Sequence, residues 1–164
     1  RAELVDNDAL FDALETGVVK RYITDFGTED LLNKPNVTVF PHVGGSTGEA
    51  ELNCAIMAGQ TIRRFMETGE IVNSVNFPRV QQALSAPYRI TLINKNVPNI
   101  VARISTAVSD FNINIDNIIN RSKGDYAYTL LDLDETDKEK IDELVAKFEA
   151  SDNIVRVRLI KGKK

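Results

Sequence analysis

The order of elements in roughly the last 77 residues constrains the fold more than any other feature. Alternating apolar positions predict four strands, and apolar stripes at helical spacing predict two helices between them. The resulting order, strand–helix–strand–strand–helix–strand, is typical of a ferredoxin-like α/β sandwich. The predicted strands cover Tyr88–Ile93, a region from Ile113 to Ile118, Tyr126–Leu133 and Ile154–Ile160, and the predicted helices start near Pro98 and cover Asp137–Ala150.

The last predicted strand shows strict alternation, which fixes its two faces. Val155, Val157 and Leu159 are expected on one face, and Arg156, Arg158 and Ile160 on the other. The dipeptide Gly124-Asp125 predicts the turn between the two central strands.

Residues 1–87 alternate helix and strand in a different way. Asp6 is placed to cap a short helix that Gly17 ends. Val18–Phe26 and Val37–Phe40 are predicted strands, separated by a loop that contains Pro35. Helix, strand, loop and strand at this spacing predict the edge of a parallel α/β sheet. The fold class predicted for the chain is therefore α/β, the tail of a doubly wound, Rossmann-like parallel sheet followed by the ferredoxin-like unit.

A long helix is predicted over Thr47–Thr68, which could bridge two domains. Ser46 and Glu49 match a capping box, and Gly69 ends the helix. Its apolar residues Cys54, Met57, Ala58, Ile62 and Phe65 share one face, and for Cys54 we expect buried packing rather than a role as nucleophile. A strand over Ile71–Phe77 follows, and the weakly patterned stretch 81–87 is predicted to be a linker.

Composition excludes several classes of protein. No apolar run approaches the roughly 20 residues of a membrane helix, and no secretory signal is visible. A net charge of −4 and a pI near 5.1 argue against a nucleic-acid partner. The single Cys54 excludes an internal disulfide and a multi-cysteine metal site, so we expect a reducing, cytoplasmic setting and no metal. Because the first residue is Arg1 rather than methionine, we expect the chain to be a fragment.

His42 is the candidate for proton transfer. A single histidine is more often a structural or surface imidazole, but His42 follows a predicted strand and precedes a glycine pair and a helix start. Ligands of open α/β sheets bind just past the carboxyl ends of strands, and an imidazole there can exchange a proton near neutral pH. Asp25 and Glu29, at or after the end of the preceding strand, are the candidate carboxylates to orient it; the alternatives are a turn residue and a solvated loop residue.

Two other features carry weaker signals. Gly44-Gly45-Ser46-Thr47-Gly48 matches neither a Walker loop nor a dinucleotide fingerprint, so we interpret its glycines as allowing close passage of the backbone. Asn94 and Asn96 lie in a polar cluster between a predicted strand and helix of the last unit, and Asn114 lies at the start of the next predicted strand region. They are as consistent with caps and turns as with amide contacts to a small polar ligand.

The motifs together resemble the D-2-hydroxyacid dehydrogenase family, in particular its members that oxidise 3-phosphoglycerate. The resemblance covers essentially the whole chain. It rests on Arg1–Asp6 with Ala9-Leu10, Thr24-Asp25-Phe26, Pro41–Thr47 with Glu49-Ala50, Asn73–Pro78, and Asn96 with Pro98.

This resemblance implies an NAD-dependent enzyme that oxidises the substrate 3-phosphoglycerate to a 2-keto acid in serine synthesis. It implies that Arg1 binds the substrate carboxylate, that His42 is the general acid/base, and that Glu29 orients His42. Asp25 and Gly44 are similar to residues beside the nicotinamide. Since the cofactor fingerprint and the amino-terminal substrate region are not in this sequence, we expect the chain alone to be inactive.

The resemblance also assigns domains. It implies the last part of a nucleotide-binding domain in 1–43, a crossover helix and the tail of a substrate-binding domain in 44–80, a linker in 81–87, and an ACT regulatory domain in 88–164. ACT domains bind an amino acid, usually serine, at a pairwise interface, which implies a homo-oligomer. Asn94, Asn96 and Asn114 match effector contacts, although Asn94 stands where bacterial relatives often carry histidine, and Asn99 replaces a glycine. The alternative is a stand-alone amino-acid-binding regulatory protein without catalysis.

Overall fold

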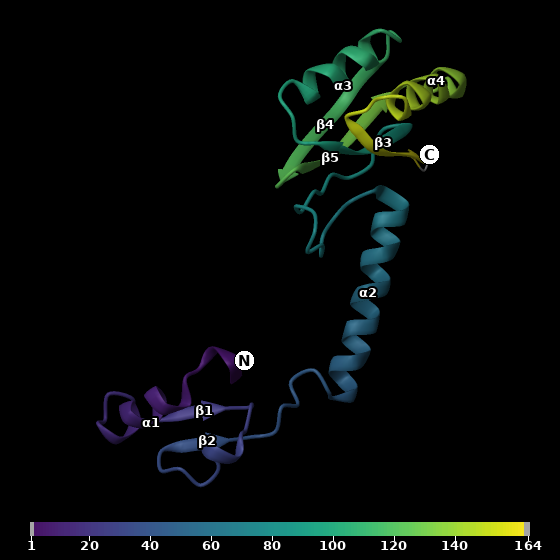
Figure 1. The fold of residues 1–164 in the computed structure, drawn as a ribbon. Coiled ribbons are helices and arrows are strands. Elements are labelled where there is room, and N and C mark those ends of the chain that lie inside the picture. Colours follow the sequence, from purple (N-terminus) through teal and green to yellow (C-terminus); the bar gives the residue numbers. More distant parts are fainter. Residues whose placement is uncertain (1, 163–164) are drawn as a thin grey trace. The chain divides into compact units, whose positions relative to one another are not determined.

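The computed structural model describes residues 2–162. The chain divides into two compact units, Arg1–Ala55 and Ile56–Lys164. Their boundary falls inside the helix α2, and each unit is described on its own (Figure 1). Arg1, the residue expected to bind the substrate carboxylate, lies outside the described residues.

The first unit is small and open. It contains the 3-10 turn η1 (Ala2–Leu4), the helix α1 (Asn7–Glu15), the strands β1 (Tyr22–Thr24) and β2 (Val37–Val39), and the turn η2 (Glu29–Leu31). β1 and β2 pair in parallel. Asp6 caps α1 as predicted, by accepting a hydrogen bond from the Ala9 amide at 3.1 Å. Both strands are shorter than predicted, and the expected Rossmann-like sheet is represented by this one parallel pair.

The helix α2 covers Gly48–Thr68, within one residue of the predicted range. Its amino end is capped by Thr47, whose hydroxyl accepts from the Ala50 amide at 3.1 Å, so the prediction of Ser46 as the cap was wrong by one residue. Gly69 ends the helix with φ +72°, as predicted. The prediction that Cys54 is buried was wrong: Cys54 is exposed, and the described part of the chain buries no residue of α2.

The second unit forms a four-stranded antiparallel sheet with two helices on one face (Figure 1). The order β4-β5-β3-β6 is that of a ferredoxin-like βαββαβ unit, and the predicted fold class of this part is confirmed. The strands are β3 (Tyr88–Lys95), β4 (Asn114–Lys123), β5 (Tyr126–Asp134) and β6 (Ile154–Lys161), and the helices are α3 (Ile100–Ser109) and α4 (Lys138–Glu149).

The main core lies between this sheet and its helices. Leu92 and Leu131 from the sheet and Ile104, Ile141 and Leu144 from the helices are essentially inaccessible to solvent. Burial of a side chain of this size contributes about 1.5–3 kcal/mol. The predicted helical stripes therefore face the sheet.

The predicted alternation of β6 holds in part. Ile93 pairs with Arg156 but Asn94 pairs with Ile154, so the register shifts and Val155 is the extra residue of a bulge. Ile154 consequently packs against the core, whereas Val155 is 58% exposed. Strict alternation correctly places Val157 and Leu159 against the core but misplaces Val155, because a bulge is a pairing property that one strand's sequence does not contain.

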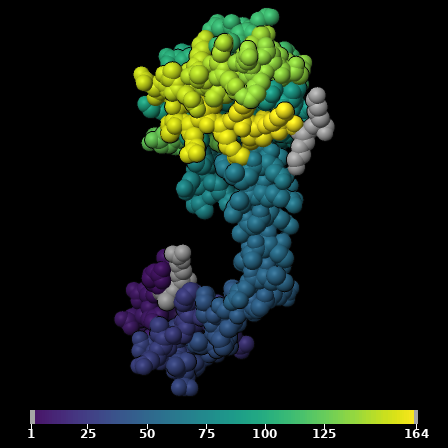
Figure 2. Space-filling model, turned by 90° about the vertical axis from the view of Figure 1, so that its right-hand side faces the viewer, coloured from purple at the N-terminus to yellow at the C-terminus, as the bar shows by residue number. Residues whose placement is uncertain are grey.

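The other face of the sheet is covered by the segment that follows α2. Ile71 and Val80 are buried against Tyr128 and Leu130 of β5. A single antiparallel bridge joins Ile71 to Val80, so the predicted strand over 71–77 was wrong. In Figure 2 the chain of β6 (yellow) lies directly against the end of α2, in agreement with the hydrogen bonds between them.

Arg89 of β3 holds the segment 81–87 to the sheet. Its guanidinium forms a bidentate ion pair with Asp132 of β5, and the two side chains are 0% and 1% exposed. The remaining donors reach the carbonyls of Thr68 at 2.8 Å, Gln82 at 2.8 Å and Ala83 at 3.1 Å. The stretch expected to be a linker is thus fixed to the sheet in the second unit.

We predict that Asp132→Leu destabilises the second unit by about 3–5 kcal/mol, because it leaves the Arg89 guanidinium buried without its counter-charge. Urea unfolding followed by circular dichroism measures the loss. Asp142→Leu is the matched control, since Asp142 pairs with Lys138 in solvent and its loss is expected to change little. A loss no larger for Asp132→Leu than for the control would contradict the structural role of the buried pair.

Candidate functional site

The first unit brings His42 and Asp25 together. Asp25 directly follows β1, and His42 lies three residues after β2. Since β1 and β2 are parallel neighbours, their carboxyl ends lie at the same edge of the sheet. Nδ1 of His42 lies 2.8 Å from Oδ2 of Asp25. The strand-end location expected for His42 is therefore seen in the structure.

Phe26 packs on the imidazole from the side. The two ring centroids are 4.5 Å apart and the planes are tilted by 44°. The His42 side chain is still 60% exposed and that of Asp25 34% exposed. When Nδ1 carries the proton it donates a hydrogen bond to the ionised carboxylate, and the Nε2 lone pair is then free to take a proton. This arrangement can perform general acid/base chemistry on a group that approaches from solvent.

The other site residues of the first unit are more scattered. Glu29 lies in η2 and is exposed, and the carboxylate that the structure places against His42 is Asp25 rather than Glu29. Gly44 is exposed in the loop before α2, and a side chain at Gly44 would meet no atom of the described chain within 4 Å. The structure thus shows an open approach at Gly44 and a His42–Asp25 pair.

In the second unit Asn94 and Asn96 have different environments. Asn94 is fully buried: its amide donates to the Lys95 carbonyl at 3.0 Å and accepts from the Thr129 hydroxyl at 2.9 Å. Asn96 is exposed, and its amide nitrogen donates to the Gly124 carbonyl at 3.0 Å. Asn94 supports the end of β3, whereas the oxygen of Asn96 is available to a ligand.

Asn114 lies at the other end of the sheet. It begins β4 opposite Asp134, whereas Asn94 is level with Ala127 and hence with Ser122. Eight residues of strand separate the two levels, roughly 25 Å. One chain therefore does not bring Asn114 to Asn96.

Asn99 occupies the position before α3 with φ +64°. Glycine takes this left-handed conformation freely, and asparagine is among the side chains that tolerate it best. The backbone geometry associated with glycine is therefore kept here with a side chain present.

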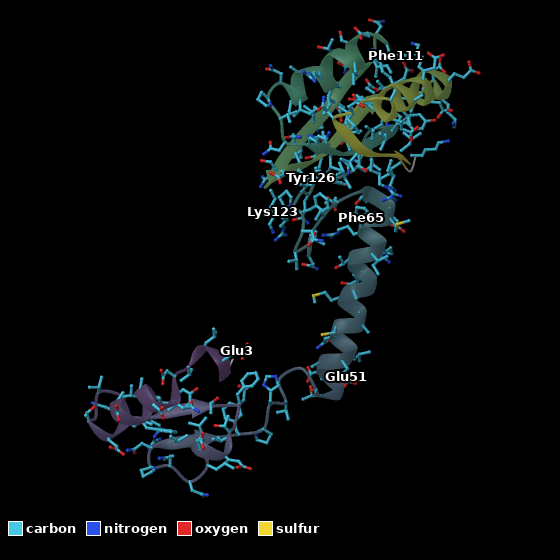
Figure 3. The ribbon with its side chains drawn as sticks, viewed as in Figure 1. Glu3, Glu51, Phe65, Phe111, Lys123 and Tyr126 are labelled. Atoms are coloured by element: carbon cyan, nitrogen blue, oxygen red, sulfur yellow. The ribbon has the colours of Figure 1, made fainter. Side chains whose placement is uncertain are left out.

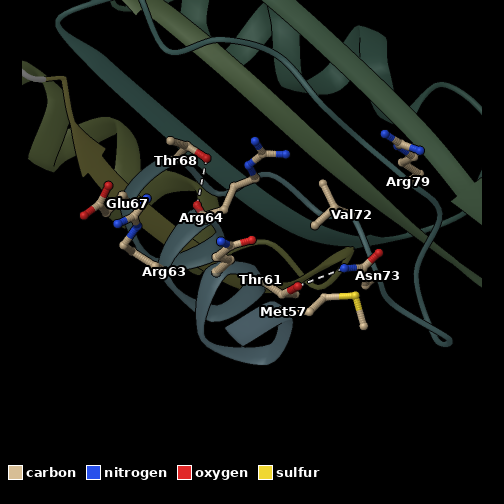
Figure 4. A pocket seen from close by; sticks show the side chains of 10 residues that line it. Met57, Thr61, Arg63, Arg64, Glu67, Thr68, Val72, Asn73 and Arg79 are labelled. Atoms are coloured by element: carbon tan, nitrogen blue, oxygen red, sulfur yellow. Dashed lines mark hydrogen bonds between the residues drawn. The ribbon is translucent and has the colours of Figure 1, made fainter. Parts of the chain in front are cut away.

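A hollow of about 400 Å³ lies between the carboxyl half of α2 and the following segment (Figure 4). Asn73 closes one wall by donating to the Thr61 hydroxyl at 2.9 Å. Arg64 is paired with Glu70 at 3.5 Å, and Arg79 donates to Gln81 at 2.6 Å. Neither His42 nor Asn96 lines this hollow.

Within residues 2–162 no group of three or more His, Cys, Asp or Glu side chains could hold a metal ion. None of the helices that the structure describes is long and apolar enough to cross a membrane.

Comparison with known proteins confirms the resemblance suggested by the motifs. No protein-family model matches the chain. D-3-phosphoglycerate dehydrogenase 2 of Saccharomyces cerevisiae is 30% identical over 139 residues, which are 81% of this chain and 29% of the yeast protein. D-3-phosphoglycerate dehydrogenase of Escherichia coli is 26% identical over 171 residues, 98% of this chain and 42% of that protein. The chain spans 29–42% of the length of these two relatives.

Two solved structures each match a little under half of the chain. The ACT domain from GTP pyrophosphokinase of Chlorobium tepidum matches 44% of this chain and 95% of its own, with 18% identity and a TM-score of 0.41. An ACT domain protein from Streptococcus pneumoniae matches 45% of this chain and 86% of its own, with 23% identity and a TM-score of 0.39.

We predict that neutral His42 carries its proton on Nδ1, because Asp25 accepts from that nitrogen and so selects the tautomer. His42 is the only histidine, so ¹⁵N-detected NMR of the imidazole gives one set of signals. Asp25→Asn is expected to remove the preference for Nδ1–H, and the matched variant Glu29→Gln to leave it unchanged. The reverse result would show that Glu29, rather than Asp25, orients the ring.

Proposed function

We propose that this chain is the carboxy-terminal part of an NAD-dependent D-3-phosphoglycerate dehydrogenase, which oxidises 3-phosphoglycerate to 3-phosphohydroxypyruvate in serine biosynthesis. The observation that carries the proposal is the His42–Asp25 pair at the carboxyl ends of two parallel strands. Similarity to proteins of that name over 81–98% of the chain supports it.

His42 acts as the general base in this proposal. Oxidation of a secondary alcohol removes a hydride from carbon and a proton from the hydroxyl. The Nε2 lone pair of His42 takes that proton, and the negative charge of Asp25 stabilises the resulting imidazolium. Phe26 restricts rotation of the ring, so that Nε2 keeps its direction while the proton moves. In the reverse reaction the same group returns the proton.

The remaining roles follow the resemblance. Arg1 binds the substrate carboxylate and polarises the carbonyl, whereas the orienting role that the resemblance gives to Glu29 is taken by Asp25, which contacts His42. Asp25 and Gly44 border the nicotinamide, and the free space beside Gly44 is compatible with a planar ring at that point. NAD, when bound, accepts the hydride. A dinucleotide fingerprint is not part of this sequence, so these residues supply the edge of a cofactor site rather than the whole.

The second unit acts as an ACT domain that senses an amino acid, serine being the candidate effector. The exposed oxygen of Asn96 is positioned to accept from an ammonium or hydroxyl group. Because Asn114 lies at the opposite end of the sheet, a site that uses both residues takes them from two copies of the chain. A homo-oligomer formed through these domains satisfies that requirement.

We assign residues 1–43 to a nucleotide-binding domain, 44–80 to the crossover helix and substrate-binding tail, 81–87 to a connection, and 88–164 to the ACT domain. A cytoplasmic enzyme agrees with the single cysteine. The second candidate function, a stand-alone amino-acid-binding regulator, is favoured by the well-packed second unit but leaves the His42–Asp25 pair without a purpose.

The proposal predicts a G-x-G-x-x-G motif roughly 80–100 residues before Arg1 in the protein that contains this chain, from the size of a dinucleotide-binding domain. In that protein His42→Gln is expected to abolish turnover and to leave NADH affinity nearly unchanged, because glutamine cannot take the proton. Stopped-flow rates and NADH fluorescence measure the two quantities. An undiminished rate would exclude the acid/base role.

For the regulatory unit we predict that Asn96→Ala weakens serine binding by about 1–3 kcal/mol through loss of hydrogen bonds in a desolvated site. Isothermal titration calorimetry of L-serine into the 164-residue chain measures this. Asn153→Ala is the control, since Asn153 follows α4 and is not among the expected contacts. Equal affinities of wild type and Asn96→Ala would restrict Asn96 to a turn-forming role.

A further inference from the structure

The turn between β4 and β5 is held from two sides. On one side Asn96 donates to the Gly124 carbonyl at 3.0 Å, and its backbone amide donates to the Asp125 carbonyl at 2.8 Å. On the other side the Lys123 ammonium donates to the carbonyl of Val75, in the segment that follows α2. Figure 3 shows Lys123 and Tyr126 at this end of the sheet.

β5 continues the connection toward the end of α2. Two residues into the strand, the Tyr128 hydroxyl donates to the Gly69 carbonyl at 2.7 Å. Burial raises the pKa of Tyr128 above its ordinary value, and a hydrogen bond with Thr91 and the charges of Arg158 and Arg89 only partly oppose this effect. The hydroxyl therefore remains a donor at neutral pH.

The next residue, Thr129, faces the other side of the sheet and donates to the buried Asn94. Thr129 also accepts from the amide of Asn120 at 2.7 Å. Near the start of β5, Thr129 is thus hydrogen-bonded to Asn94, beside the candidate effector-binding residue Asn96, and Tyr128 is hydrogen-bonded to Gly69 at the end of α2. A displacement of this short segment moves both contacts together.

Gly69, which ends α2, packs closely against the sheet. A Cβ at Gly69 would lie 2.5 Å from Cγ2 of Thr91 and 3.0 Å from Cδ1 of Ile160. Arg89 binds the Thr68 carbonyl, and Arg158 of β6 binds the carbonyls of Phe65 and Met66. These positive groups also face the negative end of the helix dipole.

We propose that the turn Lys123–Tyr126 and the start of β5 form a relay that couples ligand binding at Asn96 to the last turn of α2. The relay consists of four hydrogen bonds: Asn96 to the turn twice, Lys123 to Val75, and Tyr128 to Gly69. Because the parts are in direct contact and closely packed, a shift at Asn96 is passed on rather than absorbed. The part that concerns a ligand rests on the proposed amino-acid sensing.

Hydrogen exchange of the Gly69 amide, which donates to the Phe65 carbonyl at 2.9 Å, reports on the end of α2. In the ligand-free chain, Tyr128→Phe with Lys123→Met is expected to raise its exchange rate roughly 3- to 10-fold, the range that the loss of one or two hydrogen bonds gives. The amide of Leu131, in the centre of the sheet, is the internal reference, because global destabilisation raises both rates equally. Tyr126→Phe is the matched control variant on the same strand.

Coupling is measured by adding Asn96→Ala to both backgrounds. If the relay exists, Asn96→Ala raises the exchange rate of the Gly69 amide relative to that of the Leu131 amide in the wild-type background. In the Tyr128→Phe, Lys123→Met background, Asn96→Ala then has little further effect on this ratio. Equal effects in the two backgrounds, or no effect on Gly69 in the wild type, would overturn the relay.

L-serine supplies the second arm. If serine binds and alters Gly69 exchange in the wild type but not in the Tyr128→Phe, Lys123→Met variant, the relay is supported. If serine binds, as shown by calorimetry, and leaves Gly69 unchanged, the relay is overturned while the proposed sensing stands. If no heat of binding is measured, serine sensing is rejected and the Asn96→Ala comparison alone decides on the relay.

Discussion

The ion pair between Arg89 and Asp132 is the interaction on which the second unit's architecture depends. Two fully buried charges are tolerated only when their hydrogen bonds are satisfied, and here every bond has a partner in a fixed place. Three of those partners are backbone carbonyls, of Thr68, Gln82 and Ala83. The pair therefore requires the end of α2 and the segment after it to lie on the sheet. The second face of a ferredoxin-like sheet, which the fold itself leaves open, is closed as a consequence.

The fold of residues 88–164 could be predicted from the sequence because its determinants are local. Alternating strands, two amphipathic helices and the turn at Gly124 each carry their own pattern. The errors are all non-local or concern single backbone bonds. Val155 is displaced by a bulge, Thr47 replaces Ser46 as the cap of α2, and the segment from Ile71 is fixed by one bridge to Val80 instead of forming a strand. Arg89 lies within β3, and nothing in the sequence around it indicates that three backbone carbonyls accept from its guanidinium.

The candidate catalytic pair was within reach of sequence reasoning for a simple topological reason. Parallel strands bring the residues after their carboxyl ends together, and both Asp25 and His42 follow such strands. Choosing between Asp25 and Glu29 depends on the path of a loop, which composition and spacing do not determine. Glu29 lies in the η2 turn. Asp25 directly follows β1 and lies against His42. Resemblance to a family supplied roles for both residues but not the contact.

Asn94 and Asn96 show how burial separates two identical side chains. Asn94 is the last residue but one of β3, and Asn96 directly follows the strand. Asn94 is fully buried, and both its amide nitrogen and its amide oxygen are hydrogen-bonded. Breaking either bond would leave a buried polar group without a partner, which is costly. Asn94 is therefore suited to holding β3 against β5. Asn96 is exposed and uses only its nitrogen within the chain. A ligand can bind its oxygen without breaking a bond already made. In the proposed effector site we therefore assign ligand contact to Asn96 and a supporting role to Asn94.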